Sequence, residues 1–317
     1  MANLIIRDLM NNKPNDTPVL LLGFNRPEET GRVLERLREN RVQRLFLAVD
    51  GPREGVVQDA EKVARVRQYA QAADWGCAVE TLFNEKNMGL KKSVSRAIGW
   101  FFSRVESGII LEDDCLPSPD FFVFCRDLLE RYREDPRVMT ISGNNFHYSR
   151  PKSRTSYHFS KYPLIWGWAT WKRAWDRFDF SMSRWPSLRD SRWLDGLLGN
   201  RRHVRYWERI FDQTHREQNH SWAYRWTYSS WLNGALTAIP SANLVSNIGF
   251  SREATHTRKR IRVANAQAEP LDFPLIHPET ILVDDEMDQA IQQKHFSLSL
   301  YQKIRHRLYM MNVIKEF

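Results

Sequence analysis

The sequence predicts an α/β protein built on a mostly parallel, twisted sheet with helices on both faces. Short apolar runs alternate with longer amphipathic segments along the first half of the chain, which is typical of parallel strands joined by helices. Each apolar run also ends in polar or acidic residues, as expected where strands open onto a ligand crevice. The expected strands are residues 19–24, 45–49, 78–83 and 109–111.

The segments between these strands carry helix signals. Pro27 suits the first turn of a helix, because its missing N–H is not needed there, and apolar residues then recur on one face. A charged stretch at 59–73 and an amphipathic one at 90–104 predict two more helices. Pro119 opens a further helix, and residues 243–250 have the pattern of a closing strand and turn.

The most informative motif is the acidic triplet Glu112, Asp113 and Asp114, which directly follows the apolar run that ends at Leu111. Three carboxylates cannot lie together in a protein interior without a cation, because each buried unpaired charge is costly. At the mouth of a sheet they suit a hard divalent metal and the phosphates that such a metal carries. The triplet therefore indicates an enzyme that handles diphosphates.

Polar residues follow all four expected strands. Asn25 and Arg26 end the first, Asp50 the second, Asn84 the third and the acidic triplet the fourth. Because the carboxyl ends of parallel strands share one edge, these side chains are expected to face a single crevice.

Composition excludes several classes of protein. The 317 residues are 42% hydrophobic and 27% charged, which suits one large globular domain or two joined lobes. No apolar run approaches the roughly 20 residues that span a bilayer. We expect a soluble, cytoplasmic protein, and three cysteines without metal-type spacing fit a reducing compartment. The net charge of +9 favours anionic partners, but no nucleic-acid motif is present.

The second half is rich in tryptophan, with ten of the twelve between Trp166 and Trp231. One interpretation is packing in the core, and the other is a wall on which sugar rings stack. Gly167, between two tryptophans, indicates a close backbone approach to a ligand. Residues 285–314 have a helical pattern, which either packs on the domain or lies as a basic amphipathic helix on the inner face of an anionic membrane.

These motifs together resemble the GT-A fold glycosyltransferases, the nucleotide-diphospho-sugar transferase fold. The stretch 18–27, the acid at 50, the triplet followed by 119–122, and Trp166-Gly167-Trp168 are similar to bacterial family-2-type sugar transferases and to the N-acetylglucosaminyltransferase I group. The resemblance covers residues 17–257. It divides the chain into an extension (1–16), a nucleotide-sugar-binding part (17–150), a tryptophan-rich acceptor part (151–257) and a connection with a helical tail (258–317).

The resemblance implies an inverting transfer of a sugar from a UDP- or GDP-sugar to a glycan or lipid-linked acceptor, in bacterial surface polysaccharide biosynthesis. It implies Mn²⁺ or Mg²⁺ at Asp114. His256 is either a second metal ligand, because imidazole tolerates manganese, or a hydrogen-bonded loop histidine. The nucleotide sugar would be held by Phe24, Asn25, Arg26, Asp50, Asn87, Lys91 or Lys92, Glu112 and Asp113. The donor sugar or acceptor would be lined by Trp166, Gly167, Trp168 and Trp222.

The sequence departs from the family pattern at the general base. The expected acid is replaced by Ala223, so Glu217 and Glu253 are the candidates for the base. Two alternatives follow: a sugar-nucleotide- or glycan-binding protein with a decayed site, and a nucleotidyltransferase that makes sugar nucleotides. The nucleotidyltransferase alternative is disfavoured, because such enzymes carry a glycine-rich basic signature after the first strand and residues 24–27 lack it.

Overall fold

The computed structural model describes residues 14–71, 73, 75–145, 154–249 and 266–296. Eight strands form one sheet in the order β3-β2-β1-β4-β8-β6-β9-β7. The strands are β1 (Val19–Gly23), β2 (Arg44–Val49), β3 (Ala78–Phe83), β4 (Ser107–Glu112), β6 (Val138–Ser142), β7 (Tyr157–Ser160), β8 (Trp168–Trp171) and β9 (Leu236–Pro240).

The predicted parallel sheet is confirmed for the first half of the chain. Strands β3, β2, β1 and β4 are mutually parallel, and their register is continuous. Strand β8 then pairs antiparallel with both β4 and β6, so β6 runs parallel to β4. Strand β7 lies antiparallel to β9 at the far edge. The chain thus has a mixed α/β sheet, and the strands whose ends were predicted to line a crevice form its parallel half.

The helices are α2 (Pro27–Glu39), α3 (Val57–Gln68), α4 (Leu90–Phe102), α5 (Pro119–Arg131), α6 (Lys172–Trp175), α7 (Trp185–Asp190), α8 (Trp193–Leu198), α9 (Arg201–His215), α10 (Ala223–Leu232) and α12 (Asp285–His295). Helices α2, α3, α4, α5 and α12 were predicted, and α6 to α10 of the tryptophan-rich half were not. Pro27 and Pro119 occupy the first turns of α2 and α5, as predicted. The helix expected at 59–73 ends at Gln68, after which the Tyr69 hydroxyl donates to the Pro27 carbonyl oxygen and turns the chain onto α2.

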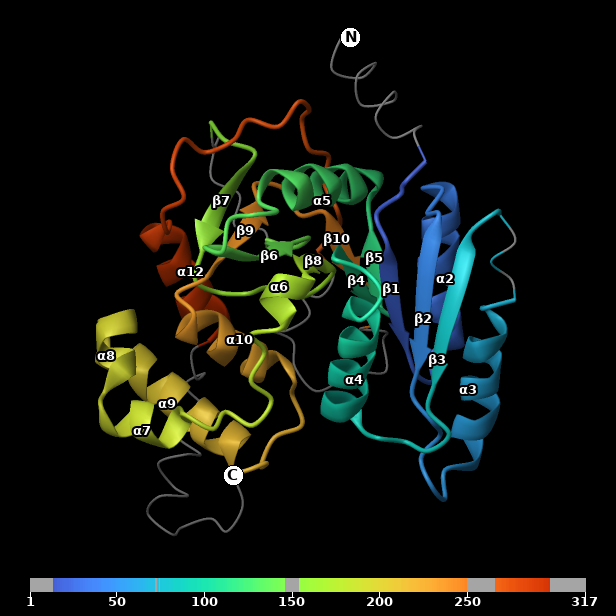
Figure 1. Cartoon of the computed structure of the whole chain (residues 1–317), viewed down its shortest axis with the longest axis horizontal. Coiled ribbons are helices and arrows are strands. Elements are labelled where there is room, and N and C mark those ends of the chain that lie inside the picture. The colour runs from blue at the N-terminus through green and yellow to red at the C-terminus, as the bar shows by residue number, and fades with distance from the viewer. Residues whose placement is uncertain (1–13, 72, 74, 146–153, 250–265, 297–317) are drawn as a thin grey trace.

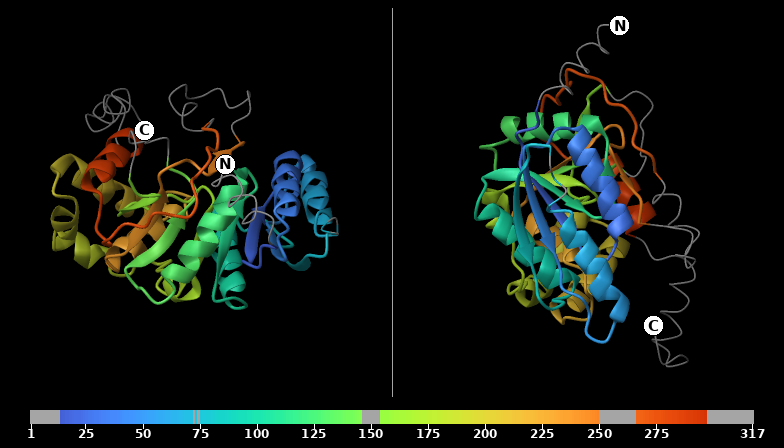
Figure 2. Two further views of the ribbon diagram at one scale, coloured as in Figure 1. Left: turned by 90° about the horizontal axis from the view of Figure 1, so that it is seen from above. Right: turned by 90° about the vertical axis from the view of Figure 1, so that its right-hand side faces the viewer.

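Alternate residues of the central strands face two different cores. Leu21 and Ile109 pack with α2, α3 and α5 on one face, whereas Leu20 and Ile110 pack with α4 and α10 on the other. A third cluster joins α7–α10 to α12. Figure 1 shows this lobe at the opposite end of the molecule from β1–β3, and Figure 2 shows α2 and α3 side by side beyond the sheet.

Two short elements complete the carboxyl edge. Strand β5 (Cys115–Pro117) pairs antiparallel with β10 (Val245–Asn247), within the predicted closing strand 243–250. Helix α12 packs through Met287 and Ile291, in line with the packing interpretation of the tail. Residues 297–314 of the predicted tail helix lie outside the described residues. No helix in the described part of the chain is long and apolar enough to cross a membrane.

Candidate active site

The four parallel strands end in line, as the sequence predicts. Gly23 pairs with Val49, Val49 pairs with Phe83, and Leu22 pairs with Glu112. The polar residues at the ends of these strands are Asn25 and Arg26 (after Phe24), Asp50, Asn84, and Asp113 with Asp114. The structure therefore brings the predicted polar residues to one edge of the sheet.

The acidic triplet is built around one cationic point. Glu112 ends β4, and Asp113 and Asp114 form the turn into β5. The Nη1 atom of Arg26, at the start of α2, lies 2.8 Å from Asp114 Oδ2 and 3.3 Å from Asp113 Oδ1. Both carboxylates thus converge on a single position, which the exposed Arg26 guanidinium fills in this structure. Arg26 contacts the acids here, whereas the resemblance implied contact with the nucleotide.

The protonation of the triplet reflects its crowding. Burial, together with the neighbouring Asp114 and Asp113 charges, raises the pKa of Glu112 to about 8 against the opposing effect of Arg26. Burial likewise raises the pKa of Asp113 to about 7, with Arg26 opposing and Asp114 adding to the shift. The edge has more carboxylate charge than Arg26 neutralises, which is the condition in which an added cation stabilises a site.

The residues that follow β10 contact both the backbone and the carboxylate of Asp114. The Ile248 N–H donates to the Asp114 carbonyl oxygen at 2.8 Å, and a Cβ atom at position 249 would lie 2.3 Å from Asp114 Oδ2. Glycine at 249 therefore lets the β5–β10 ribbon approach the carboxylate. A hollow of about 610 Å³ adjoins this ribbon and α2. It is lined by Arg32, Arg36, Leu116, Pro117, Ser118, Ser246, Asn247, Ile248, Ala266, Gln267 and Ala268.

Asp50 organises the loop between β3 and α4. Its carboxylate accepts hydrogen bonds from the side chains of Asn84 and Asn87 and from the backbone N–H groups of Gly51, Met88 and Gly89. With five donors on two oxygens, Asp50 holds this loop rather than presenting a free carboxylate. Asp50 and Asn87, each predicted to bind the nucleotide sugar, are brought together, and Asn87 donates a hydrogen bond to Asp50.

A second cluster at the ends of β1 and β2 was not predicted. The buried Asp59 carboxylate accepts from Asn25 Nδ2 at 2.7 Å and from Arg53 Nε at 2.5 Å. Hydrogen bonds from Arg53 hold the pKa of Asp59 well below its usual range. The Arg53 guanidinium also lies over the Phe24 ring, 5.5 Å from its centroid. Asp59 begins a charged helical stretch in the sequence, so no pattern distinguished it from a surface acid.

Lys91 and Glu217, predicted for different roles, contact each other. Glu217 Oε2 forms an ion pair with Lys91 at the start of α4, and its Oε1 accepts from the buried Arg225 of α10 at 2.5 Å. Cations therefore engage both carboxylate oxygens of this base candidate. The contact ties the loop between α9 and α10 to the nucleotide half of the sheet.

The tryptophans mainly pack in the core. Trp168, in β8, stacks on Trp222, with ring centroids 5.7 Å apart, and both side chains are buried. The Trp222 indole also donates a hydrogen bond to the Glu112 carboxylate, so this packed pair reaches the triplet. Packing thus describes Trp168 and Trp222, and their predicted stacking on a sugar stays a prediction. Trp166 is only partly buried.

Gly167 meets protein rather than open space. It has a φ of 64°, and a Cβ atom there would lie 2.8 Å from Val245 Cγ2 of the β10 strand. The close approach inferred from the sequence is real, but its observed partner is Val245. Glycine at this position lets β10 and β8 converge at the sheet edge.

The remaining predicted residues concern the base and the metal. Ala223 is the first residue of α10, directly after Trp222. Glu253 and His256 lie outside the described residues. Among residues that the structure does describe, no three His, Cys, Asp or Glu side chains form a metal cage. The convergent pair of Asp113 and Asp114 instead fits a metal held by one or two carboxylates together with substrate phosphates.

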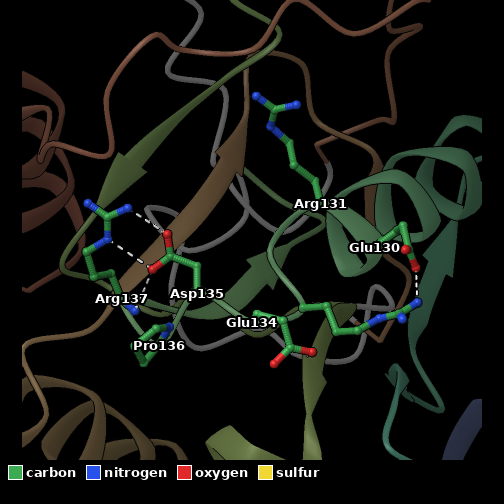
Figure 3. A pocket seen from close by; sticks show the side chains of 7 residues that line it. Glu130, Arg131, Glu134, Asp135, Pro136 and Arg137 are labelled. Carbon is green, nitrogen blue, oxygen red and sulfur yellow. Dashed lines mark hydrogen bonds and ion pairs between the residues drawn. The ribbon is translucent and has the colours of Figure 1, made fainter.

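A separate surface hollow lies away from this edge. It measures about 650 Å³ and is lined by residues 130, 131 and 133–137, between α5 and β6 (Figure 3). Because β6 runs parallel to β4, its start lies at the edge opposite the acids. Arg137 and Asp135 pair with each other here at 2.6 Å, and the hollow presents both signs of charge.

Known proteins give only distant likenesses. No family model and no curated protein matches the sequence. HddC from Yersinia pseudotuberculosis is 10% identical, covers 50% of this chain and 77% of its own, and has a TM-score of 0.30, as does its complex with GMP-PN. The inositol-1-phosphate CTP transferase from T. maritima is 12% identical, covers 80% and 97%, and has a TM-score of 0.37. These TM-scores are too low to identify the fold family or activity.

Proposed function

We propose that the chain is a metal-dependent transferase with the GT-A fold that moves a sugar from a nucleoside diphosphate sugar to an acceptor hydroxyl. The observation that carries the proposal is the convergence of Asp113 and Asp114 on one cationic point at the end of β4. The parallel order β3-β2-β1-β4 supports it, because ligands of such sheets bind beyond the carboxyl ends.

In this proposal Asp114, with Asp113, holds a divalent cation. The bound metal would supply Lewis-acid stabilisation of the charge that develops on the leaving diphosphate. Arg26, displaced from the carboxylates, contributes a second positive charge to the same phosphates. The Asn25–Asp59–Arg53 cluster beside Phe24 binds the nucleoside, and the Asp50 loop shapes that corner. Mn²⁺ and Mg²⁺ both suit these oxygen ligands.

The transfer breaks the bond between the anomeric carbon and the β-phosphate oxygen and forms a bond to the acceptor oxygen. The proton of the acceptor hydroxyl passes to a base. Glu217 is the base candidate that lies within the described residues, and its release from Lys91 would accompany binding of the diphosphate. The lysine then pairs with phosphate, and the carboxylate is free to accept the proton.

Nucleotidyl transfer is the second candidate, because two carboxylates converging on one cation would serve a nucleoside triphosphate equally well. The three-residue connection Phe24–Arg26 between β1 and α2 contains no glycine and so favours glycosyl transfer over this alternative. A third candidate is a binding protein that has lost turnover, which Ala223 favours.

Product analysis distinguishes the three candidates. The protein is incubated with Mn²⁺ and either nucleoside diphosphate sugars or a nucleoside triphosphate with a sugar phosphate. Glycosyl transfer or hydrolysis releases nucleoside diphosphate in the first mixture, whereas nucleotidyl transfer releases pyrophosphate in the second. We expect nucleoside diphosphate, lost in Asp114→Ala and kept in the matched surface variant Asp176→Asn. Pyrophosphate alone would identify a nucleotidyltransferase, and tight binding with neither product would identify a binding protein.

A further inference from the structure

The sheet register places Glu112 and Ser142, which contacts Asn144, on the same face of the carboxyl edge. Trp168 of β8 pairs with Ile110 on one side and with Ser142 on the other, so these three side chains share a face. The Gly143 N–H donates to the Gly167 carbonyl oxygen at 2.7 Å, which continues the β6–β8 pairing beyond Ser142. Two residues further towards the edge, the same face carries Glu112. Asn144 lies beyond the end of β6, and its Oδ1 lies 3.2 Å from the hydroxyl of Ser142, which is on this face. Trp166, beyond Gly167 with its φ of 64°, packs against the cluster on the opposite face.

The tryptophan stack confirms which face this is. Trp222 stacks on Trp168 and donates a hydrogen bond to Glu112, so Glu112 and Trp168 lie on the side covered by α4 and α10. Neighbouring strands are about 4.8 Å apart. The ends of β4 and β6, two strands apart, are thus separated by about 10 Å, which is room for a sugar ring beside a phosphate.

Two buried hydrogen-bond donors on this face have no partner within the part of the chain that the structure describes. They are Asn144 Nδ2 and Trp168 Nε1, and both residues are 1% exposed. The orientation of Asn144 is fixed, because its N–H donates to Ser142 Oγ and the Ser142 hydroxyl lies 2.9 Å from its carbonyl oxygen and 3.2 Å from its Oδ1. The amide nitrogen is thereby directed away from Ser142.

A neighbouring asparagine shows the contrast. Asn145 Nδ2 donates to the Ser241 carbonyl oxygen at 3.1 Å, so its amide has a structural partner. An unsatisfied buried donor lowers the stability of the fold. Two such donors on one face, next to a carboxylate of the proposed site, are expected where a ligand supplies the missing acceptors.

We propose that Asn144 binds the sugar of the nucleotide sugar, with its amide N–H donating to a hydroxyl or carbonyl oxygen of that sugar and the Trp168 indole as a second donor. This inference rests on the proposed glycosyl transfer and names the part of the site that recognises the sugar. A site that binds hydroxyl groups through buried donors discriminates strongly against ligands without them.

The test compares the affinities of Asn144→Leu and wild type for a nucleoside diphosphate and for the corresponding nucleoside diphosphate sugar, by calorimetry with Mn²⁺. We expect unchanged affinity for the diphosphate and an affinity for the sugar nucleotide weakened about tenfold. Asn144→Ala and Trp168→Phe should act in the same direction. The melting temperature of Asn144→Leu should stay level or rise, because an unsatisfied donor is removed, whereas that of the control Asn145→Leu should fall.

Each other outcome is decisive. Equal affinities of wild type and Asn144→Leu for the sugar nucleotide would overturn the assignment, as would an equal loss for both ligands. A melting temperature lowered as much as in Asn145→Leu would assign Asn144 a structural role instead. If wild type bound the diphosphate but gained nothing from the sugar, this inference would fail while the nucleotide site stood. If wild type bound neither ligand, the proposed function itself would fail.

Discussion

Replacing Asp113 by asparagine is predicted to stabilise the folded protein at about neutral pH and above, because the ionised Asp113 carboxylate destabilises it there. Burial raises the pKa of Asp113 from 3.8 to about 7, a difference of about three units. At about 1.4 kcal/mol per unit, the ionised carboxylate costs the folded state on the order of 4 kcal/mol relative to the unfolded chain. The asparagine of the Asp113→Asn variant would keep the size of the side chain and carry no charge.

The direction in which the free energy of unfolding changes with pH follows from the number of protons that the folded and unfolded states bind. Between pH 3.8 and about 7 the unfolded chain has released the Asp113 proton and the folded protein still holds it. The stability that the protonated Asp113 carboxyl gives the folded state is therefore fully present below pH 3.8. It is lost as the pH rises through the folded pKa of about 7. Wild type should lose more free energy of unfolding than Asp113→Asn across this window, in the absence of metal.

Urea unfolding at several pH values, with divalent metal removed by a chelator, measures this difference. The matched control is Asp176→Asn, an exposed acid that pairs with Lys172 at 2.7 Å on the surface. The control should follow the wild-type pH dependence, and Asp113→Asn should be flatter and more stable at about pH 8. Parallel curves for wild type and Asp113→Asn would refute the reasoning that the triplet is short of positive charge.

Three further predictions concern the same edge. Mn²⁺ should raise the melting temperature more at about pH 8 than at about pH 5.5, because the metal competes with protons on Glu112 and Asp113; an equal shift at both would place the metal elsewhere. Ala223→Asp puts a carboxylate at the start of α10 beside Trp222 and should raise sugar transfer about a hundredfold if the missing acid limits turnover; unchanged kinetics would place the base elsewhere. Gly51→Ala would bring a Cβ within 2.3 Å of the Lys86 backbone and should cost about 1–3 kcal/mol of stability in urea unfolding; an unchanged midpoint would contradict the close packing of this loop.

The strands and helices of the parallel half could be predicted because their signals are local. Each strand there is an apolar run, and Pro27 and Pro119 mark two helix starts. The convergence of the strand ends then follows from the rule for parallel sheets. The insertion of β8 between β4 and β6 could not be predicted, because antiparallel pairing of distant segments leaves no local pattern.

The site residues divide in the same way. The triplet is visible in the sequence because three adjacent acids directly follow an apolar run, where burial of unpaired charges is costly. The partners of single polar residues are not visible: Asp50 binds its own loop, and Asp59 is enclosed by Arg53 and Asn25. These pairings join residues on different loops, so only the folded chain distinguishes them from surface charges.

The density of tryptophans between Trp166 and Trp231 did not decide between packing in the core and binding of a sugar. Large aromatic side chains serve cores and sugar sites equally well. In the structure Trp168 and Trp222 are buried, and the proposed sugar site rests on the unsatisfied donors at Trp168 and Asn144. Such details depend on strand register, which the sequence does not specify.

The central claim is that the triplet holds a metal that carries a nucleoside diphosphate. Its most direct test is calorimetric titration of nucleoside diphosphates into wild type and Asp114→Asn, each with Mn²⁺ and with chelator. We predict binding by wild type that requires Mn²⁺, weakened at least about tenfold in Asp114→Asn. Binding of the same strength with and without metal, or in both proteins, would contradict the claim.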